Sequence, residues 1–231
     1  MDVSELRPPS TALRLAEYPR ALWTAAEWLR ARPLLQSAPC GDGPVMVLPG
    51  LFNSDISAAV MRRFLAGRGY DAHGWALGRN LGLRTIGAEG GRLLERIEAV
   101  AEDAGRPVAL VGVSLGGIMA RFAAHRRPDL VARVVTVSAP FAGDVKATNI
   151  WRTFEWVTGE KVDGPAIATL LAECRAHPPV PTTAIWSASD GLVNGRLCRD
   201  DRARAVKVRS GHLWVQFKPA VLRAVADALA D

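Results

Sequence analysis

The chain has 231 residues, of which 49% are hydrophobic and 23% are charged, and its formal net charge is +6. This length suits one domain over residues 1–231, and the apolar content can fill a core without disulfides or a metal. The three cysteines are widely spaced with no C-x-x-C pair, which predicts free thiols, no zinc site and a cytoplasmic location. Basic and acidic residues alternate along the whole chain, so we expect no nucleic-acid partner.

The N-terminal region is predicted to be helical. Residues 10–32 have a helical pattern with an expected break at Pro19, and we assign 1–38 to an N-terminal helical segment. Trp23 and Trp28 leave two interpretations, a helix docked on the core or a helix lying on a membrane surface. The acids and the proline favour docking. No apolar run approaches the roughly 20 residues of a membrane span, so stable membrane insertion is not expected.

The rest of the chain alternates short apolar runs with helical patterns. Strands are predicted at 45–48, 71–77, 108–113, 134–138, 182–187 and 205–209. Helices are predicted at 55–67, 88–104, 115–126 and 219–230, with a glycine-rich loop at 78–84. Mostly apolar strands separated by helices predict an α/β fold with a doubly wound, mostly parallel six-stranded sheet.

One interval interrupts this alternation. More than forty residues separate the strand that ends near Ser138 from the strand that begins near Thr182. The interval contains two helical stretches, at about 148–158 and 164–176. A crossover helix needs a much shorter segment, so residues 144–178 are predicted to form a small, cap-like helical insertion over the carboxyl ends of the strands.

Residues 111–118 read V-G-V-S-L-G-G-I and contain a G-x-S-x-G motif between a predicted strand and a predicted helix. This is the setting of a nucleophile elbow, where small neighbours let the strand turn sharply into the helix and raise the serine above the sheet. Ser114 is therefore the predicted nucleophile. The backbone N–H of Leu115, at the helix N-terminus, is a predicted oxyanion donor. The alternative is a glycine-rich turn that only packs.

A serine nucleophile needs a base and an acid that orients the base, and an acid followed by a histidine is the expected chain order here. Asp190 follows the strand at 182–187, and His212 follows the strand at 205–209. Both can reach Ser114 from one edge of the sheet. The fallback acids are Asp163 and Asp144. The remaining histidines occupy no suitable position and are assigned surface or packing roles: His73, His125 and His177.

A second oxyanion donor is expected from the loop after the first strand, which reads P-G-L-F-N-S-D. Its donor is the backbone N–H of Leu51 or of Phe52, and Leu51 is preferred. The alternative is a tight turn into a helix capped by Ser54 or Asp55.

Together these segments resemble an α/β-hydrolase of the bacterial esterase/lipase type, in particular small lipases with a minimal six-strand core. The matching pieces are V-M-V-L-P-G-L-F, G-V-S-L-G-G, W-S-A-S-D-G-L-V and S-G-H-L-W, in that order over roughly residues 44–230. The resemblance implies the α/β-hydrolase fold and a Ser-His-Asp triad that needs no cofactor and no metal. Pro49 and Val113 replace histidines often found in such enzymes, and the two added helical segments have no counterpart in the small lipases.

Several residues are candidates for substrate binding. Trp151 and Phe154, in the insertion, could form an acyl pocket or a lid, or could simply bury the insertion against the core. Phe52 and Trp214 flank the presumed oxyanion loop and the catalytic histidine. The remaining candidates, Arg79 and Asn80, follow the second strand on the side where ligands bind to such sheets, and anchoring the loop is an equal alternative for both.

The predicted function is that of a serine hydrolase that cleaves small carboxylic esters with short or medium acyl chains through an acyl-enzyme. An acyltransferase or a thioesterase could use the same triad. A hydrolase-fold protein that binds without catalysis is the remaining alternative, and the complete set of Ser114, Asp190 and His212 argues against it.

Overall fold

The computed structural model describes residues 6–231, and its centre is a six-stranded sheet with the order β2-β1-β3-β4-β5-β6. The strands are β1 (Pro44–Leu48), β2 (Asp71–Gly74), β3 (Val108–Val113), β4 (Val131–Val137), β5 (Thr182–Ser187) and β6 (Arg204–Val208). The five pairings between these strands are all parallel. The predicted doubly wound sheet is confirmed, and it is wholly rather than mostly parallel.

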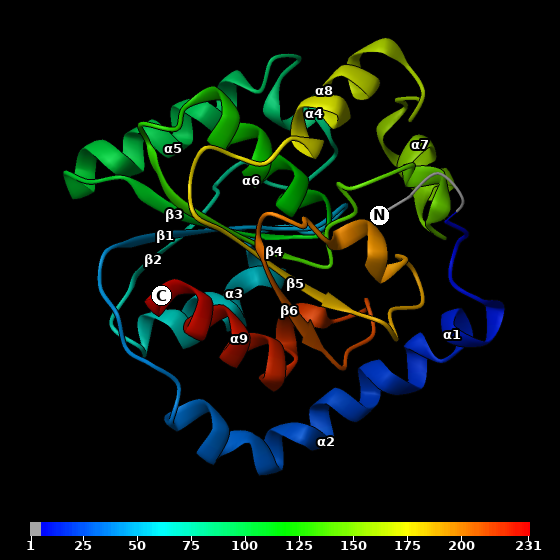
Figure 1. Cartoon of the computed structure of the whole chain (residues 1–231). Coiled ribbons are helices and arrows are strands. Elements are labelled where there is room, and N and C mark those ends of the chain that lie inside the picture. The colour runs from blue at the N-terminus through cyan, green and yellow to red at the C-terminus, as the bar shows by residue number, and fades with distance from the viewer. Residues whose placement is uncertain (1–5) are drawn as a thin grey trace.

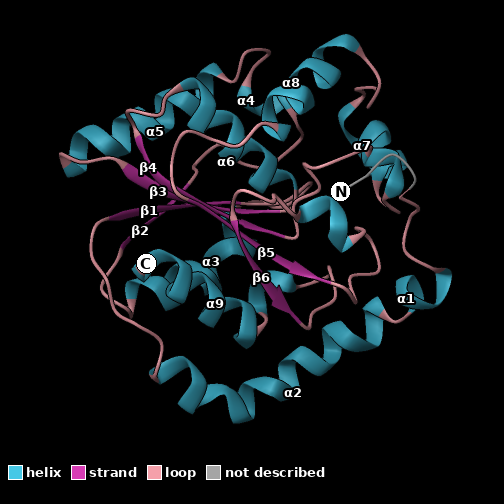
Figure 2. Ribbon diagram, in the orientation of Figure 1, coloured by secondary structure: helices cyan, strands magenta, loops and turns pink. Residues whose placement is uncertain are grey.

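Helices cover both faces of the sheet (Figures 1 and 2). On one face lie α5 (Gly91–Ala104) and α6 (Leu115–Arg126), and on the other lie α3 (Asp55–Ala66) and α9 (Pro219–Ala230). The predicted loop at 78–84 runs into a short helix, α4 (Leu83–Ile86). Two short 3-10 turns follow the last strands, η2 (Gly195–Cys198) after β5 and η3 (Val215–Phe217) after β6.

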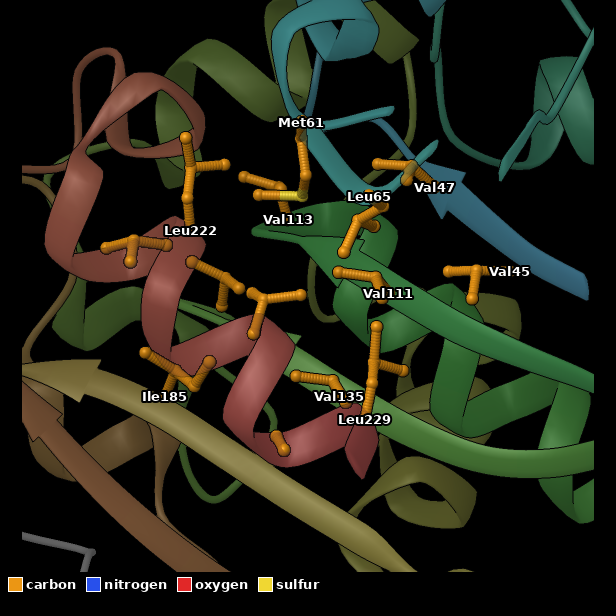
Figure 3. Close-up of a cluster of buried hydrophobic side chains, with 14 of the residues drawn as sticks. Val45, Val47, Met61, Leu65, Val111, Val113, Val135, Ile185, Leu222 and Leu229 are labelled. Carbon is orange, nitrogen blue, oxygen red and sulfur yellow. The ribbon is translucent and has the colours of Figure 1, made fainter. Parts of the chain in front are cut away.

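Alternate residues of the buried strands face opposite helical layers, as the pleat requires. Val45 and Val47 of β1 pack with side chains of α3 and α9, in the cluster drawn in Figure 3. Met46 and Leu48 of the same strand belong to the cluster that includes residues of α5 and α6. Because both faces are covered, β1 is buried at every position, which explains its continuous apolar sequence.

The N-terminal segment forms α1 (Thr11–Leu15) and α2 (Glu17–Gln36). The helix break predicted at Pro19 is wrong, because the two helices meet at Ala16. Pro19 lies in the first turn of α2, where a missing N–H leaves no intrahelical bond unmade. The helix α2 lies beside α9 (Figure 1), and Trp28 Nε1 donates a hydrogen bond to the carbonyl oxygen of Phe217 over 2.9 Å.

Between β4 and β5 the chain forms a 3-10 turn, η1 (Val145–Ala147), and two helices, α7 (Trp151–Thr158) and α8 (Pro165–Arg175). The helix α8 packs against α6, and α7 lies at the end of the sheet toward which β5 and β6 point (Figure 1). Over residues 6–231, none of the helices combines the length and the apolar character needed to cross a membrane.

The core packing between the sheet and α9 predicts a large effect of Leu222→Ala. Leu222 is fully buried in the cluster of Figure 3, and its truncation leaves a cavity that should lower the free energy of unfolding by about 2–5 kcal/mol. Leu22→Ala is the control, because Leu22 is 69% exposed and its loss should change stability by less than about 0.5 kcal/mol. Urea denaturation measures both values, and equal effects would contradict this packing.

Candidate active site

Ser114 occupies a sharp turn between β3 and α6. Its backbone angles are φ 52° and ψ −120°, a region that residues with a side chain rarely adopt. Two backbone hydrogen bonds fix the turn, from Ser114 N to the Val137 carbonyl over 2.8 Å and from Gly117 N to the Ser114 carbonyl over 2.9 Å. The neighbouring strand β4 and the first turn of α6 therefore hold this strained conformation together.

The glycines of the motif are required by contacts between backbones. A Cβ atom on Gly112 would lie 2.3 Å from the carbonyl oxygen of Gly116, and one on Gly116 would lie 2.4 Å from the carbonyl oxygen of Leu48. Neither oxygen can move away without displacing a strand or a helix. Small residues at these two positions thus let α6 start directly against β3 and β1, which is the geometry of a nucleophile elbow.

His212 connects the serine to a buried carboxylate. Its Nε2 lies 3.1 Å from Ser114 Oγ, and its Nδ1 lies 2.8 Å from Asp190 Oδ2. A carboxylate only accepts hydrogen bonds, so the imidazole carries its proton on Nδ1 and Nε2 is free to accept from the serine hydroxyl. The three side chains come from the turns after β3, β5 and β6 and form one hydrogen-bonded line.

Asp190 is almost completely buried, and its second oxygen is fixed by the backbone of its own loop. Oδ1 accepts hydrogen bonds from the amides of Leu192 and Val193 at 2.9 and 2.8 Å. The two fallback acids, Asp144 and Asp163, instead bind Lys146. The other three histidines form hydrogen bonds away from Ser114: His73 with Asp71, His125 with the Ala176 carbonyl and His177 with Asp200.

Two opposing effects act on the pKa of His212. Burial disfavours the charged imidazolium and alone would lower this pKa. The negative charge of Asp190 and the hydrogen bond to it act in the opposite direction, with a further contribution from Glu17, so the pKa of His212 lies above its ordinary value. The site therefore stabilises the imidazolium that forms when this ring accepts a proton.

Two backbone amides beside Ser114 are available to a ligand. Within residues 6–231, neither the Leu51 amide nor the Leu115 amide donates to another group. The amide of Phe52, the alternative to Leu51, donates to the Asn80 carbonyl over 2.7 Å. Leu51, Ser114 and Leu115 line the same cavity.

The loop after β1 is held close to the serine by Asn80. The Asn80 side chain is fully buried, and its Nδ2 donates to the Pro49 carbonyl over 2.7 Å. Arg79 lies on the surface with its guanidinium 4.8 Å from the ring centre of Phe52. Asn80 therefore supports the loop, which is one of the two roles expected for it, while Arg79 and Phe52 form an exposed pair beside it.

The cavity above Ser114 is mainly apolar. Trp151 and Phe154 of α7 line it, whereas Phe52, Arg79, Asn80 and Trp214 do not. Further residues from α4, α6 and the insertion also line the cavity, among them Ile86, Ile118, Met119, Val145, Ile150, Glu160, Val162, Ile167, Leu170 and Leu171. The sequence predicted a helix at 164–176 but did not indicate that this helix lines the cavity.

No cluster of three or more histidine, cysteine or acidic residues suited to a metal ion occurs in the described part of the chain. The groups that meet at Ser114 are a hydroxyl, an imidazole and a carboxylate.

Comparison with known proteins identifies the architecture. A family model described as alpha/beta hydrolase fold matches residues 103–171, the segment that contains Ser114 and most of the insertion. The mature lipase BlEst2 of Bacillus licheniformis superposes with a TM-score of 0.59 at 18% identity, covering 84% of this chain and 92% of that one. No curated protein matches the sequence.

Two further structures show the same architecture. The monoacylglycerol lipase of Paleococcus ferrophilus has a TM-score of 0.55 and 14% identity over 83% of this chain and 96% of its own. The thioesterase domain from the curacin biosynthetic pathway has a TM-score of 0.52 and 15% identity over 84% of this chain and 92% of its own. The chain has the α/β-hydrolase fold, as the resemblance in its sequence implied.

The contact between His212 and Asp190 predicts the direction of a titration. In the wild-type protein, His212 should titrate above the ordinary histidine pKa of about 6.5, because Asp190 stabilises the protonated ring. Asp190→Asn removes that charge and should lower the pKa of His212, since burial then dominates. NMR of the imidazole signals against pH measures both, and the signal that is missing from His212→Gln identifies His212. An unchanged pKa in Asp190→Asn would contradict the described geometry.

Proposed function

We propose that this protein is a serine hydrolase that cleaves carboxylic esters with short or medium apolar acyl chains. The observation that carries the proposal is the hydrogen-bonded line from Asp190 through His212 to Ser114, which ends beside two unpaired backbone amides at an apolar cavity. A nucleophile, a base, an acid that orients the base, and oxyanion donors are the groups that acyl transfer requires.

Acylation begins when the ester carbonyl carbon lies next to Ser114 Oγ. His212 Nε2 takes the hydroxyl proton as Oγ attacks, and the carbonyl oxygen becomes an oxyanion. The amides of Leu51 and Leu115 donate hydrogen bonds to this oxyanion. Asp190 accepts from Nδ1 throughout and stabilises the imidazolium, which is the form that the raised pKa of His212 favours.

The intermediate then collapses. The bond from the carbonyl carbon to the alcohol oxygen breaks, and His212 gives its proton to the leaving alcohol. Water enters, loses a proton to His212 and attacks the acyl-Ser114 ester, and the acid is released as the proton returns to Oγ. The ring thus serves as base and acid in turn, and no cofactor enters either half of the reaction.

The cavity supports an apolar acyl chain as the bound group. Its lining brings together side chains of α6, α7 and α8, so we propose that residues 144–178 form a cap that contributes the acyl pocket. The names of two of the compared proteins describe lipases, and their fold is shared here. A thioesterase or an acyltransferase would form the same acyl-enzyme. A thioesterase would release a thiol instead of an alcohol, and an acyltransferase would pass the acyl group to an acceptor other than water.

Covalent labelling tests the nucleophile. A fluorophosphonate probe should label the wild-type protein on Ser114, because the serine is activated by His212. Ser114→Ala should abolish the labelling and reduce hydrolysis of p-nitrophenyl esters on the order of 10⁶-fold. Mass spectrometry identifies the labelled peptide.

Ser138→Ala is the matched control for this experiment. Ser138 also follows a strand and has a positive φ of 50°, and it donates or accepts no hydrogen bond with His212 among the described contacts. This variant should keep the label. If the wild type is not labelled and turns over none of a panel of oxygen esters, thioesters and acceptor alcohols, the protein is a binding protein rather than a hydrolase.

The acyl pocket predicts a dependence on chain length. Trp151→Ala removes part of the cavity wall and should lower kcat/KM for p-nitrophenyl octanoate about tenfold, with a much smaller effect on the acetate. Trp156→Ala is the control, because Trp156 belongs to the same helix but is 84% exposed. Equal changes for acetate and octanoate would show that the acyl chain lies elsewhere.

A further inference from the structure

A carboxylate that the mechanism above does not use is buried next to it. Glu17, the first residue of α2, is only 1% exposed. Its Oε1 accepts a hydrogen bond from the amide of Gly191 over 2.6 Å. Its Oε2 accepts from the amides of His212 and Leu213 over 2.7 and 2.8 Å. One carboxylate therefore joins the residue after Asp190 to the backbone of His212 itself.

The two loops are shaped to receive the N-terminal segment. A Cβ atom on Gly191 would lie 2.3 Å from the carbonyl oxygen of Leu13, and one on Gly211 would lie 2.6 Å from Glu17 Oε2. Arg20, on the next turn of α2, donates to the carbonyl of Ser189 over 2.6 Å. The chain thus has glycine at the two points where α1 and α2 come closest to the loops.

We propose that Glu17 is a positioning residue that holds the loop of Asp190 and the loop of His212 in catalytic register. The inference rests on the proposed hydrolase function, because it gives Glu17 a role in the same site. Burying a carboxylate is costly unless its oxygens are hydrogen-bonded, and the three donors here are amides of these two loops alone. Any displacement of Glu17 must therefore leave a buried charge unsatisfied or move the loops with it.

The charge of Glu17 also acts on the imidazole. The titratable groups that face His212 are Asp190 from the loop after β5 and Glu17 from α2, and both raise its pKa. Cys198 of η2 interacts with Asp190, and the Arg20 side chain donates to the Ser189 carbonyl. Glu17 is thus a second negative charge that favours the imidazolium, and a structural support without charge would not have this effect.

The test is Glu17→Gln in the full chain, a substitution that keeps size but removes the charge and turns an –NH₂ group toward at least one backbone N–H. We expect kcat/KM for a short p-nitrophenyl ester to fall about 10-fold to 100-fold on its pH plateau, as a small displacement of reacting groups does. The acid limb of the pH profile should move to lower pH, because the loss of negative charge lowers the pKa of His212.

The matched control is Glu27→Gln. Glu27 lies on the same helix and pairs with Lys218, away from both loops, so this variant should keep the wild-type rate and pH profile. Gly211→Ala is a second variant, which crowds Glu17 Oε2 while it keeps the charge. It should lower kcat/KM less than Glu17→Gln does and leave the acid limb nearer to that of the wild type.

NMR titration of His212 in the Ser114→Ala background separates this proposal from the proposed function, because it needs no turnover. A lower pKa of His212 upon Glu17→Gln supports the action of the Glu17 charge on the imidazole even if no ester is hydrolysed, and the fall in kcat/KM in Gly211→Ala, which keeps the charge, supports the positioning of the loops. The proposal is overturned if Glu17→Gln changes neither the pKa of His212 nor kcat/KM, whether or not the substitution lowers stability. If Glu17→Gln does not fold, wild-type kinetics in Gly211→Ala overturn it as well.

Discussion

The close approach of three backbone segments at the turn after β3 is the constraint on which the site depends. Gly112, Gly116 and the Leu48 carbonyl are in contact with no room for a side chain between them. A residue at a positive φ such as Ser114 costs on the order of 1–3 kcal/mol, and the packed sheet and α6 hold it there. The same contact brings the end of β1 next to the serine, and Leu51 and Leu115 line one cavity with it.

Most of the fold could be predicted from the sequence, because a buried parallel strand leaves a continuous apolar run. The order of the sheet then explains why His212 could be paired with Asp190 and with Ser114, which lie 22 and 98 residues before it in the chain. Each follows a strand whose carboxyl end lies at the same edge. The structure brings these three side chains within hydrogen-bonding distance, and their catalytic role is the prediction that the labelling experiment tests.

Other features had no local signature. The break between α1 and α2 lies at Ala16 rather than at Pro19, because proline is compatible with the first turn of a helix. The choice between loop anchor and ligand contact for Asn80 depended on burial, which the loop sequence does not reveal. Glu17 is one of two acids in α2, and its partners lie 174 to 196 residues further along the chain.

That separation has a consequence for how the protein is made. Glu17 leaves the ribosome before residues 191, 212 and 213, whose amides its buried carboxylate requires. During synthesis α2 can make these contacts only after the loops that follow β5 and β6 have emerged, and contacts between such distant residues form late because closing a long loop costs chain entropy. Docking of α1 and α2 is thus coupled to completion of the loops that carry Asp190 and His212.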